Sequence, residues 1–272
     1  MPLTNLQSSI LRLIARNRNP ESFVAGSAWL ARTGPRYSSD IDIFHDRELR
    51  AGEAADRDSE ALRAAGYHVA FSGRSPMFIQ ALVSSGGETT KPEWVVDSEF
   101  RFFPVVQDEV FGYILHPVDL ATNKVMAVAG RREPRDVVDL LAFHGQTLPL
   151  GALIWAAVEK APGFTPEALI NEIRRLATYR QDDFDRVACD SPYDAATVAR
   201  AIRAALFEAE AFVEQMPTDK AGLLFLENGK PVQPDPARLA DYETHAGSRR
   251  GLWPSSSEIG SAMLESYGKI GL

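Results

Sequence analysis

Apolar and polar residues follow each other in the first half of the chain in patterns that predict short strands between helices. Apolar positions within residues 5–15 recur at helical spacing, and a second helix is predicted over about residues 56–65. Residues 40–44 (DIDIF) alternate strictly between acidic and apolar, which predicts a β-strand. Further strand-like runs cover residues 67–71, 77–83, 94–97 and 100–106. This order predicts an α+β (mixed α/β) fold in which helices pack on a sheet.

From about residue 117 onward, apolar positions recur mainly at helical spacing. Helices are predicted over residues 119–129, 134–144, 151–161, 166–178 and 195–214. Asn228-Gly229 lies between two apolar runs, which predicts a tight hairpin. We therefore expect a first domain over residues 1–146, and a mainly helical domain with a small hairpin over residues 147–272.

Composition narrows the class of protein. The chain has 272 residues, of which 45% are hydrophobic and 24% are charged, as in ordinary globular proteins. No apolar run reaches the roughly 18 residues that a membrane-spanning helix needs. Cys189 is the single cysteine, which excludes an internal disulfide and a cysteine-rich zinc site. We expect a cytoplasmic protein that does not associate with membranes.

The net charge affects which partners are plausible. At −8, it argues against a protein that coats nucleic acid without sequence preference, because clustered cations drive such binding. It leaves room for a local basic patch that serves one substrate.

The strand over residues 40–44 carries the most specific chemical signal. Alternate side chains of a strand share a face, so Asp40 and Asp42 should point one way, and Ile41 and Ile43 into a core. Two adjacent carboxylates repel each other unless a cation neutralises them, and oxygen ligands of this kind suit Mg²⁺. The alternative is an edge strand that carries two solvated acids.

A glycine–serine step lies upstream of these acids. Gly26-Ser27 ends an apolar run, precedes a helix-like stretch at residues 28–32, and is separated from Asp40 by twelve residues. Backbone N–H groups at such a corner can meet a phosphate, and glycine allows close approach. An ordinary strand-to-helix turn is the alternative. Taken together with the two aspartates, this corner indicates a site for a metal–triphosphate unit.

At this point the sequence resembles a family. Residues 25–27 (AGS) followed by residues 40–43 (DIDI) are similar to the signature of the polymerase-β-like nucleotidyltransferase superfamily. The resemblance implies a third carboxylate on a neighbouring strand, for which Asp97 is the candidate and Glu99 the reserve. A turn-capping aspartate is the alternative for Asp97.

A second set of motifs narrows the resemblance. Asn123-Lys124, followed by residues 135–140 (RDVVDL), resembles the AbiEii/AbiGii toxin-type nucleotidyltransferases, and the similarity covers residues 22–143. It implies that Lys124 and Asp136 belong to the active site. Lysine snorkelling and a first-turn aspartate favoured by the helix dipole are the alternatives.

The resemblance assigns further roles around these residues. The nucleotide-binding candidates share a position near the triphosphate and are Gly26, Ser27, Ser39, Lys124, Arg131 and Arg135. Arg131, Arg132 and Arg135 form a basic cluster whose alternative is a solvated helix face. Arg135 and Asp139 are four residues apart, so they can also pair on the helix surface.

The implied reaction is the transfer of an NMP from an NTP to an acceptor hydroxyl. Asp40, Asp42 and Asp97 would hold two Mg²⁺ ions, Lys124 would neutralise charge on the leaving pyrophosphate, and Asp136 would orient Lys124 or the acceptor. The family further implies an RNA acceptor, in particular the 3′ end of tRNA, and a cognate antitoxin. The alternatives are a small-molecule (antibiotic) or protein acceptor, or a non-catalytic NTP-binding module.

Overall fold

A computed structural model describes residues 3–26, 30, 36–38, 40–97, 100–161 and 163–248. Their contacts divide into two units. Unit 1 holds the described residues up to 97 together with Pro104–His116, and unit 2 holds Phe100–Phe103 and the described residues from Pro117 onward. Ser27 and Ser39 lie outside the described residues, as do all but one of the residues of the helix predicted at 28–32.

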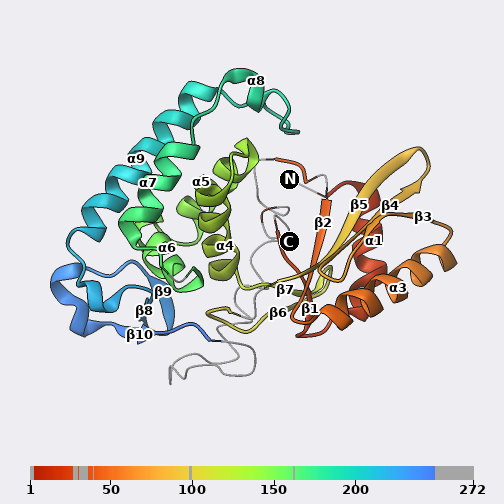
Figure 1. Cartoon of the computed structure of the whole chain (residues 1–272), viewed down its shortest axis with the longest axis horizontal. Coiled ribbons are helices and arrows are strands. Elements are labelled where there is room, and N and C mark those ends of the chain that lie inside the picture. Colours follow the sequence, from red (N-terminus) through yellow and green to blue (C-terminus); the bar gives the residue numbers. More distant parts are fainter. Residues whose placement is uncertain are drawn as a thin grey trace. The chain divides into compact units, whose positions relative to one another are not determined.

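Unit 1 is built on a seven-stranded sheet in the order β3-β4-β5-β2-β1-β7-β6 (Figure 1). The strands are β1 (Ser22–Val24), β2 (Asp40–His45), β3 (His68–Arg74), β4 (Phe78–Ser85), β5 (Glu88–Val96), β6 (Val106–Asp108) and β7 (Gly112–Ile114). β2 pairs with β5 in parallel and with β1 antiparallel, so the sheet is mixed, as predicted.

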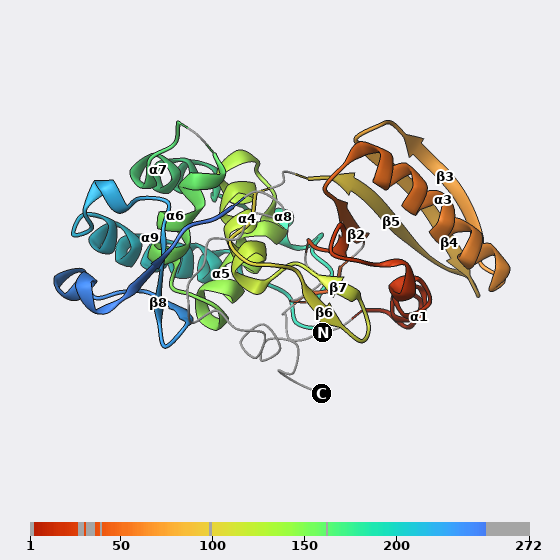
Figure 2. The same ribbon diagram turned by 90° about the horizontal axis from the view of Figure 1, so that it is seen from below.

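Two helices cover one face of this sheet, namely α1 (Asn5–Ile14), which continues as the short helix η1 (Ala15–Asn17), and α3 (Glu48–Ala64) (Figures 1 and 2). The side chains that β2 and β5 turn toward the helices, such as Ile43 and Trp94, are fully buried. The alternate side chains of both strands point to the other face, which these helices leave uncovered.

A buried ion pair joins the helices to the sheet. The Asp58 carboxylate of α3 accepts hydrogen bonds from Arg18, from Asn17 Nδ2 and from Trp94 Nε1 of β5. Arg18 and Asp58 are fully buried, and breaking such a pair costs about 3–5 kcal/mol because one charge is left uncompensated. The network therefore fixes where β5 lies on α3.

Three elements differ from their predicted bounds. α3 begins at Glu48 rather than near residue 56, because its first turns bury small alanines that give a weak apolar signal. β5 begins at Glu88 rather than at 94, because its polar half pairs with β4. Residues 100–106 do not form one strand, since the backbone N–H groups of Phe102 and Phe103 donate to the Asp119 carboxylate of unit 2.

Unit 2 is mainly helical, as predicted. Its α-helices are α4 (Pro117–Gly130), α5 (Pro134–Gln146), α6 (Leu150–Ala157), α7 (Pro166–Leu176), α8 (Gln181–Phe184) and α9 (Ala195–Val213). The short helices are η2 (Val158–Lys160), η3 (Thr218–Lys220) and η4 (Pro236–Asp241), and β8 (Leu224–Glu227), β9 (Lys230–Val232) and β10 (Glu243–His245) form a small sheet. The predicted hairpin is β8–β9, and both Asn228 and Gly229 have positive φ.

The predicted boundary at residues 146–147 falls inside unit 2. α4 is buried along most of its length and packs against α6 and α7, so it folds with the helices that follow it. Within the described part of the chain no single helix is long and apolar enough to cross a membrane. α5 and residues 150–160 meet that criterion only as a pair, and they are bent by 111°.

Candidate active site

Asp40 and Asp42 project from β2 onto the face of the sheet that α1 and α3 leave uncovered. Both are half-buried, whereas Ile41 and Ile43 are 3% and 0% exposed on the helix side. The predicted alternation of this strand is therefore confirmed. Side chains two residues apart on one strand are about 6.5 Å apart at their base, so the two carboxylates can share a bound ion.

Gly26 lies directly against the second of these acids. Its φ is +64°, and a Cβ added to it would lie 1.8 Å from Asp42 Oδ2. β1 and β2 are neighbours here, since the Ala25 N–H donates to the Asp42 carbonyl at 3.0 Å. A side chain at position 26 would therefore displace the Asp42 carboxylate, and the positive φ also favours glycine here. The sequence predicted a close approach at this residue, but to phosphate.

The register between β2 and β5 brings a third carboxylate beside the pair. In this parallel ladder Asp40 is opposite Lys91, and Asp42 is opposite Glu93. Residues directly opposite each other point to the same face of a sheet. Glu93 is half-buried, and its Oε1 accepts a hydrogen bond from Gln80 Nε2 of β4 at 2.7 Å. Glu93 was not predicted from the sequence, because the register between two distant strands cannot be recognised from the residues around it.

Asp97 lies further along the same direction. It follows the last residue of β5, four residues beyond Glu93, and its N–H donates to the His45 carbonyl at 3.0 Å. Four residues of strand span about 13 Å, so Asp97 belongs to the far end of β2 rather than to the end that carries Asp40. Asp97 as a metal ligand stays a prediction, and Glu99 lies outside the described residues.

The start of β2 is held by a buried glutamine from α1. Gln7 is 2% exposed, and its Nε2 donates to the Ser38 carbonyl at 2.8 Å and to Thr90 Oγ1 at 3.2 Å. The same side chain closes a capping box with Thr4 at the helix N-terminus. Gln7 thus ties the backbone just before Asp40 to the strand that carries Glu93.

The acids of unit 1 fit a magnesium site that is completed by substrate. Carboxylate oxygens are hard ligands of the kind that Mg²⁺ prefers. Among the described residues no three His, Cys, Asp or Glu side chains already converge on one metal position. Asp40 and Asp42 would therefore supply two ligands, and phosphate oxygens and water would supply the others, as is usual for Mg²⁺ bound with nucleotides.

A second cluster lies within unit 2 and is centred on Lys124. The Lys124 ammonium on α4 contacts Asp136 Oδ1 at 2.8 Å and Asp139 Oδ2 at 3.0 Å, both on α5. The two carboxylates are 1% and 0% exposed, and Lys124 is 10% exposed. Lys124 therefore does not snorkel away from the core; two acids fix its ammonium. Asp136 thus contacts Lys124, and its role in orienting Lys124 or the acceptor stays a prediction.

The neighbouring arginines are engaged with acids of unit 2. Arg131 Nε contacts Asp136 Oδ2 at 2.7 Å, and its side chain is 55% exposed. Arg132 contacts Asp183 at 2.7 Å and lies over the ring of Tyr179. Arg135 is 3.9 Å from Glu133. Asp139, its alternative partner four residues further on, contacts the buried Lys124.

Burial and charge act in opposite directions on Asp136. Burial raises the pKa of its carboxyl, but the Lys124 charge and the hydrogen bonds from Arg131 and Lys124 outweigh burial and lower the pKa to about 2. Burial and the charge of Asp136 together raise the pKa of the nearby Tyr179 hydroxyl to about 12. Asp136 is therefore ionised, and Tyr179 neutral, at any physiological pH.

We expect acid to weaken unit 2 through Asp136. Because the folded-state pKa of about 2 lies below the ordinary aspartate pKa of 3.8, the ionised carboxylate stabilises the fold fully above about pH 4.5, and that stabilisation is lost as the pH falls toward 2. The difference corresponds to about 2 kcal/mol. Urea unfolding of the full chain and of Asp136→Asn between pH 5 and pH 2 measures it. The variant should lose less stability than the parent over this range, and equal losses would contradict the assignment.

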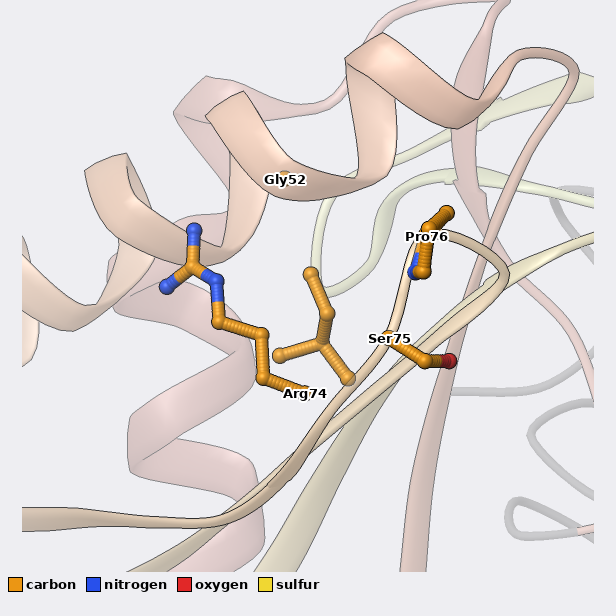
Figure 3. Close-up of a pocket in the computed structure, with 5 residues that line it drawn as sticks. Gly52, Arg74, Ser75 and Pro76 are labelled. Atoms are coloured by element: carbon orange, nitrogen blue, oxygen red, sulfur yellow. The ribbon is translucent and has the colours of Figure 1, made fainter.

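A pocket of about 280 Å³ lies elsewhere on unit 1 (Figure 3). It is lined by Gly52 of α3 and by Arg74, Ser75, Pro76 and Ile79 at the β3–β4 turn. Arg74 forms a bidentate ion pair with Asp56, with N–O distances of 2.7 and 2.8 Å. Ile79 and Gly52 place the pocket on the helix side of the sheet. It is thus separate from the face that carries Asp40 and Asp42.

Comparison with known proteins supports the fold. No protein-family model and no curated protein matches the sequence. The structure is similar to that of MenT4, a nucleotidyltransferase toxin from Mycobacterium tuberculosis H37Rv, with a TM-score of 0.54 and 16% identity over 79% of this chain and 83% of that chain. Two structures of Cid1 also match. One, described by its RNA terminal uridylyl transferase activity, has a TM-score of 0.29 and 11% identity over 78% of this chain and 65% of that chain. The other, a poly(U) polymerase with MgGTP bound, has a TM-score of 0.28 and 12% identity over 79% and 90%. The match to MenT4 confirms the predicted nucleotidyltransferase fold.

Proposed function

We propose that this chain is a Mg²⁺-dependent nucleotidyltransferase that moves an NMP from an NTP to a hydroxyl of RNA, and that it acts as the toxin-like component of a toxin–antitoxin pair. The 3′ end of tRNA is the acceptor we favour. The observation that carries the proposal is the Gly26–Asp42 contact beside Asp40, on the sheet of a nucleotidyltransferase fold. MenT4 is itself a nucleotidyltransferase toxin, which supports the toxin-like role and an antitoxin partner.

In the proposed reaction the acceptor oxygen bonds to the α-phosphorus while the bond between that phosphorus and the bridging oxygen breaks, and pyrophosphate leaves. Mg²⁺ bound by Asp40 and Asp42 would acidify the attacking hydroxyl and neutralise charge on the triphosphate. The lack of a side chain at Gly26 leaves the Asp42 carboxylate in place and the backbone accessible. Glu93, opposite Asp42 in the register of β5, is the third carboxylate that we propose for the set once substrate is bound.

Lys124 is the proposed contact of the leaving pyrophosphate. Its ammonium is already desolvated and held by Asp136 and Asp139, so little reorganisation is needed when charge develops on the leaving pyrophosphate. Arg131, which is half exposed while it contacts Asp136, extends the same cluster toward solvent. Ser27, Ser39 and Arg135 remain proposed contacts of the nucleotide. We place the activity in the cytoplasm, where NTPs and RNA are available.

The proposal is tested by incubating the full chain with Mg²⁺, total bacterial RNA and each NTP labelled at the α-phosphate. We expect one or more of the NTPs to label RNA, and EDTA to abolish the labelling. Removal of label by a 3′ exonuclease, together with a tRNA-sized product, would identify the acceptor end.

Other outcomes of the same assay distinguish the alternatives. Label on protein, or on a small molecule, with none on RNA would replace the RNA acceptor by that class while keeping nucleotidyl transfer. Mg²⁺-dependent NTP binding without pyrophosphate release in the presence of any acceptor would indicate a binding module, and would contradict the proposed activity.

A further inference from the structure

The outer face of α9 carries an exposed aromatic side chain that the proposed reaction does not use. Phe207 is 73% exposed, more than any other large hydrophobic side chain among the described residues. The opposite side of α9 is buried against α6 and α7, through residues such as Ile202 and Ala209. Figure 1 shows α9 running along the outer side of α7. The outer face of α9 around Phe207 therefore forms an exposed stripe on a helix whose other side is firmly packed.

Two opposite charges lie at equal distances from Phe207 along α9. Arg200 and Glu214 lie seven residues before and after it, which is two helical turns, so all three side chains fall on one line about 10.5 Å apart. All three are exposed. The stripe is therefore basic toward the N-terminus of α9, apolar at its centre and acidic toward its C-terminus.

Among the described residues, neither Arg200 nor Glu214 forms an ion pair. Within the described residues Arg200 donates a hydrogen bond to the Thr197 hydroxyl of the same helix at 2.8 Å. Hydrogen bonds from Thr197, and to a lesser extent the Arg200 charge, lower the pKa of the Asp194 carboxyl. Glu214 makes no ion pair with any described residue. By contrast Glu210, on the flank of α9 that faces α7, is already paired with Arg174 at 2.9 Å. Arg200 and Glu214 therefore lie on the outer face of α9 with Phe207, whereas the paired Glu210 lies on the flank that faces α7.

Small residues leave room beside the aromatic ring. Ala204 and Ala211, three residues before and four residues after Phe207, are exposed on the same side of it. Their side chains are single methyl groups, so they leave the Phe207 ring accessible on that side.

We propose that this stripe is the self-association surface of the protein, through which α9 pairs antiparallel with α9 of a second copy about a two-fold axis at Phe207. In that arrangement the two Phe207 rings stack against each other and against Ala204 and Ala211. Arg200 of each copy then meets Glu214 of the other, which gives two equivalent ion pairs. A parallel arrangement would set arginine against arginine, so the charges select the antiparallel one.

The size of the surface sets the strength of the association. One helix of 19 residues presents a contact at the low end of protein interfaces, which is typical of reversible complexes. We therefore expect a dimer with a dissociation constant in the micromolar range. The inference is independent of the proposed nucleotidyl transfer.

Sedimentation velocity of the full chain, from about 1 to about 100 µM, tests the association. The sedimentation coefficient should rise with concentration toward that of a dimer, and Phe207→Glu should stay monomeric throughout. Because Phe207 is exposed, the variant should melt at the same temperature as the parent. A parent that is monomeric over the whole range, or a Phe207→Glu variant that associates equally, would overturn the proposal.

Charge reversal tests the two-fold pairing itself. Arg200→Glu and Glu214→Arg should each weaken association about tenfold, and the double variant should regain the parent value, because it restores both ion pairs with the charges exchanged. Glu208→Arg is the matched control, since it is exposed on α9 but lies about 100° from the stripe, and it should leave association unchanged. A double variant as weak as the single ones would show that α9 does not pair in this way.

Discussion

Replacing Asp42 with asparagine is expected to lower nucleotidyl transfer about 10³-fold, because the amide keeps the shape of the side chain but loses the charge that holds the metal. The side chain is half-buried and borders Gly26, so the substitution fits without backbone movement. The measurement is single-turnover transfer of label from the NTP at saturating Mg²⁺, with circular dichroism and thermal melting to show that the fold persists. Activity within about tenfold of the parent would remove Asp42 from the site.

Two companion variants identify the third carboxylate. Glu93→Gln and Asp97→Asn each remove one negative charge, the first on β5 and the second just after its end, four residues apart. The register places Glu93, rather than Asp97, opposite Asp42, so the larger loss of activity should follow from Glu93→Gln. A larger loss from Asp97→Asn would favour the carboxylate predicted from sequence.

Replacing Gly26 with alanine should abolish detectable transfer, since the new methyl group would occupy the position of Asp42 Oδ2. Either the carboxylate rotates away from Asp40 or β1 separates from β2, and both outcomes disrupt the acidic pair. The positive φ of +64° adds a backbone penalty of about 1 kcal/mol. Thermal melting and the transfer assay together report the two effects.

Gly66→Ala provides the matched control for that variant. Gly66 also has a positive φ, +89°, but a Cβ there meets no atom within 4 Å. It should therefore show a backbone penalty of the same kind while keeping full activity. If Gly26→Ala keeps activity as Gly66→Ala does, the contact between Gly26 and the Asp42 carboxylate has no role in the reaction.

The features of the site and of the fold that the sequence predicted are those that depend on residues close together along the chain. The strand of Asp40 and Asp42 and the face that each residue takes follow from the alternation of five residues. The positive φ at Asn228-Gly229 follows from the chemistry of a two-residue turn. Both are set by neighbours along the chain, so periodicity was sufficient to find them.

The parts that the sequence did not predict depend on packing between distant segments. Glu93 joins the acids only because β5 pairs in parallel with β2 in one particular register. For Asp139 the sequence offered only a possible surface pair with Arg135, whereas the packing of α5 on α4 brings Asp139 to Lys124. Residues 100–106 have the apolar pattern of a strand, but the buried Asp119 carboxylate accepts hydrogen bonds from the backbone N–H groups of Phe102 and Phe103 instead.

The central claim is that Asp40 and Asp42 bind a divalent cation together with the phosphates of an NTP. Crystals of the full chain grown with a non-hydrolysable NTP and Mn²⁺, which anomalous scattering locates directly, test it. The account predicts an anomalous peak about 2.1 Å from a carboxylate oxygen of each aspartate, with phosphate oxygens on the same ion. Bound nucleotide whose phosphates and metal lie away from both aspartates would contradict it.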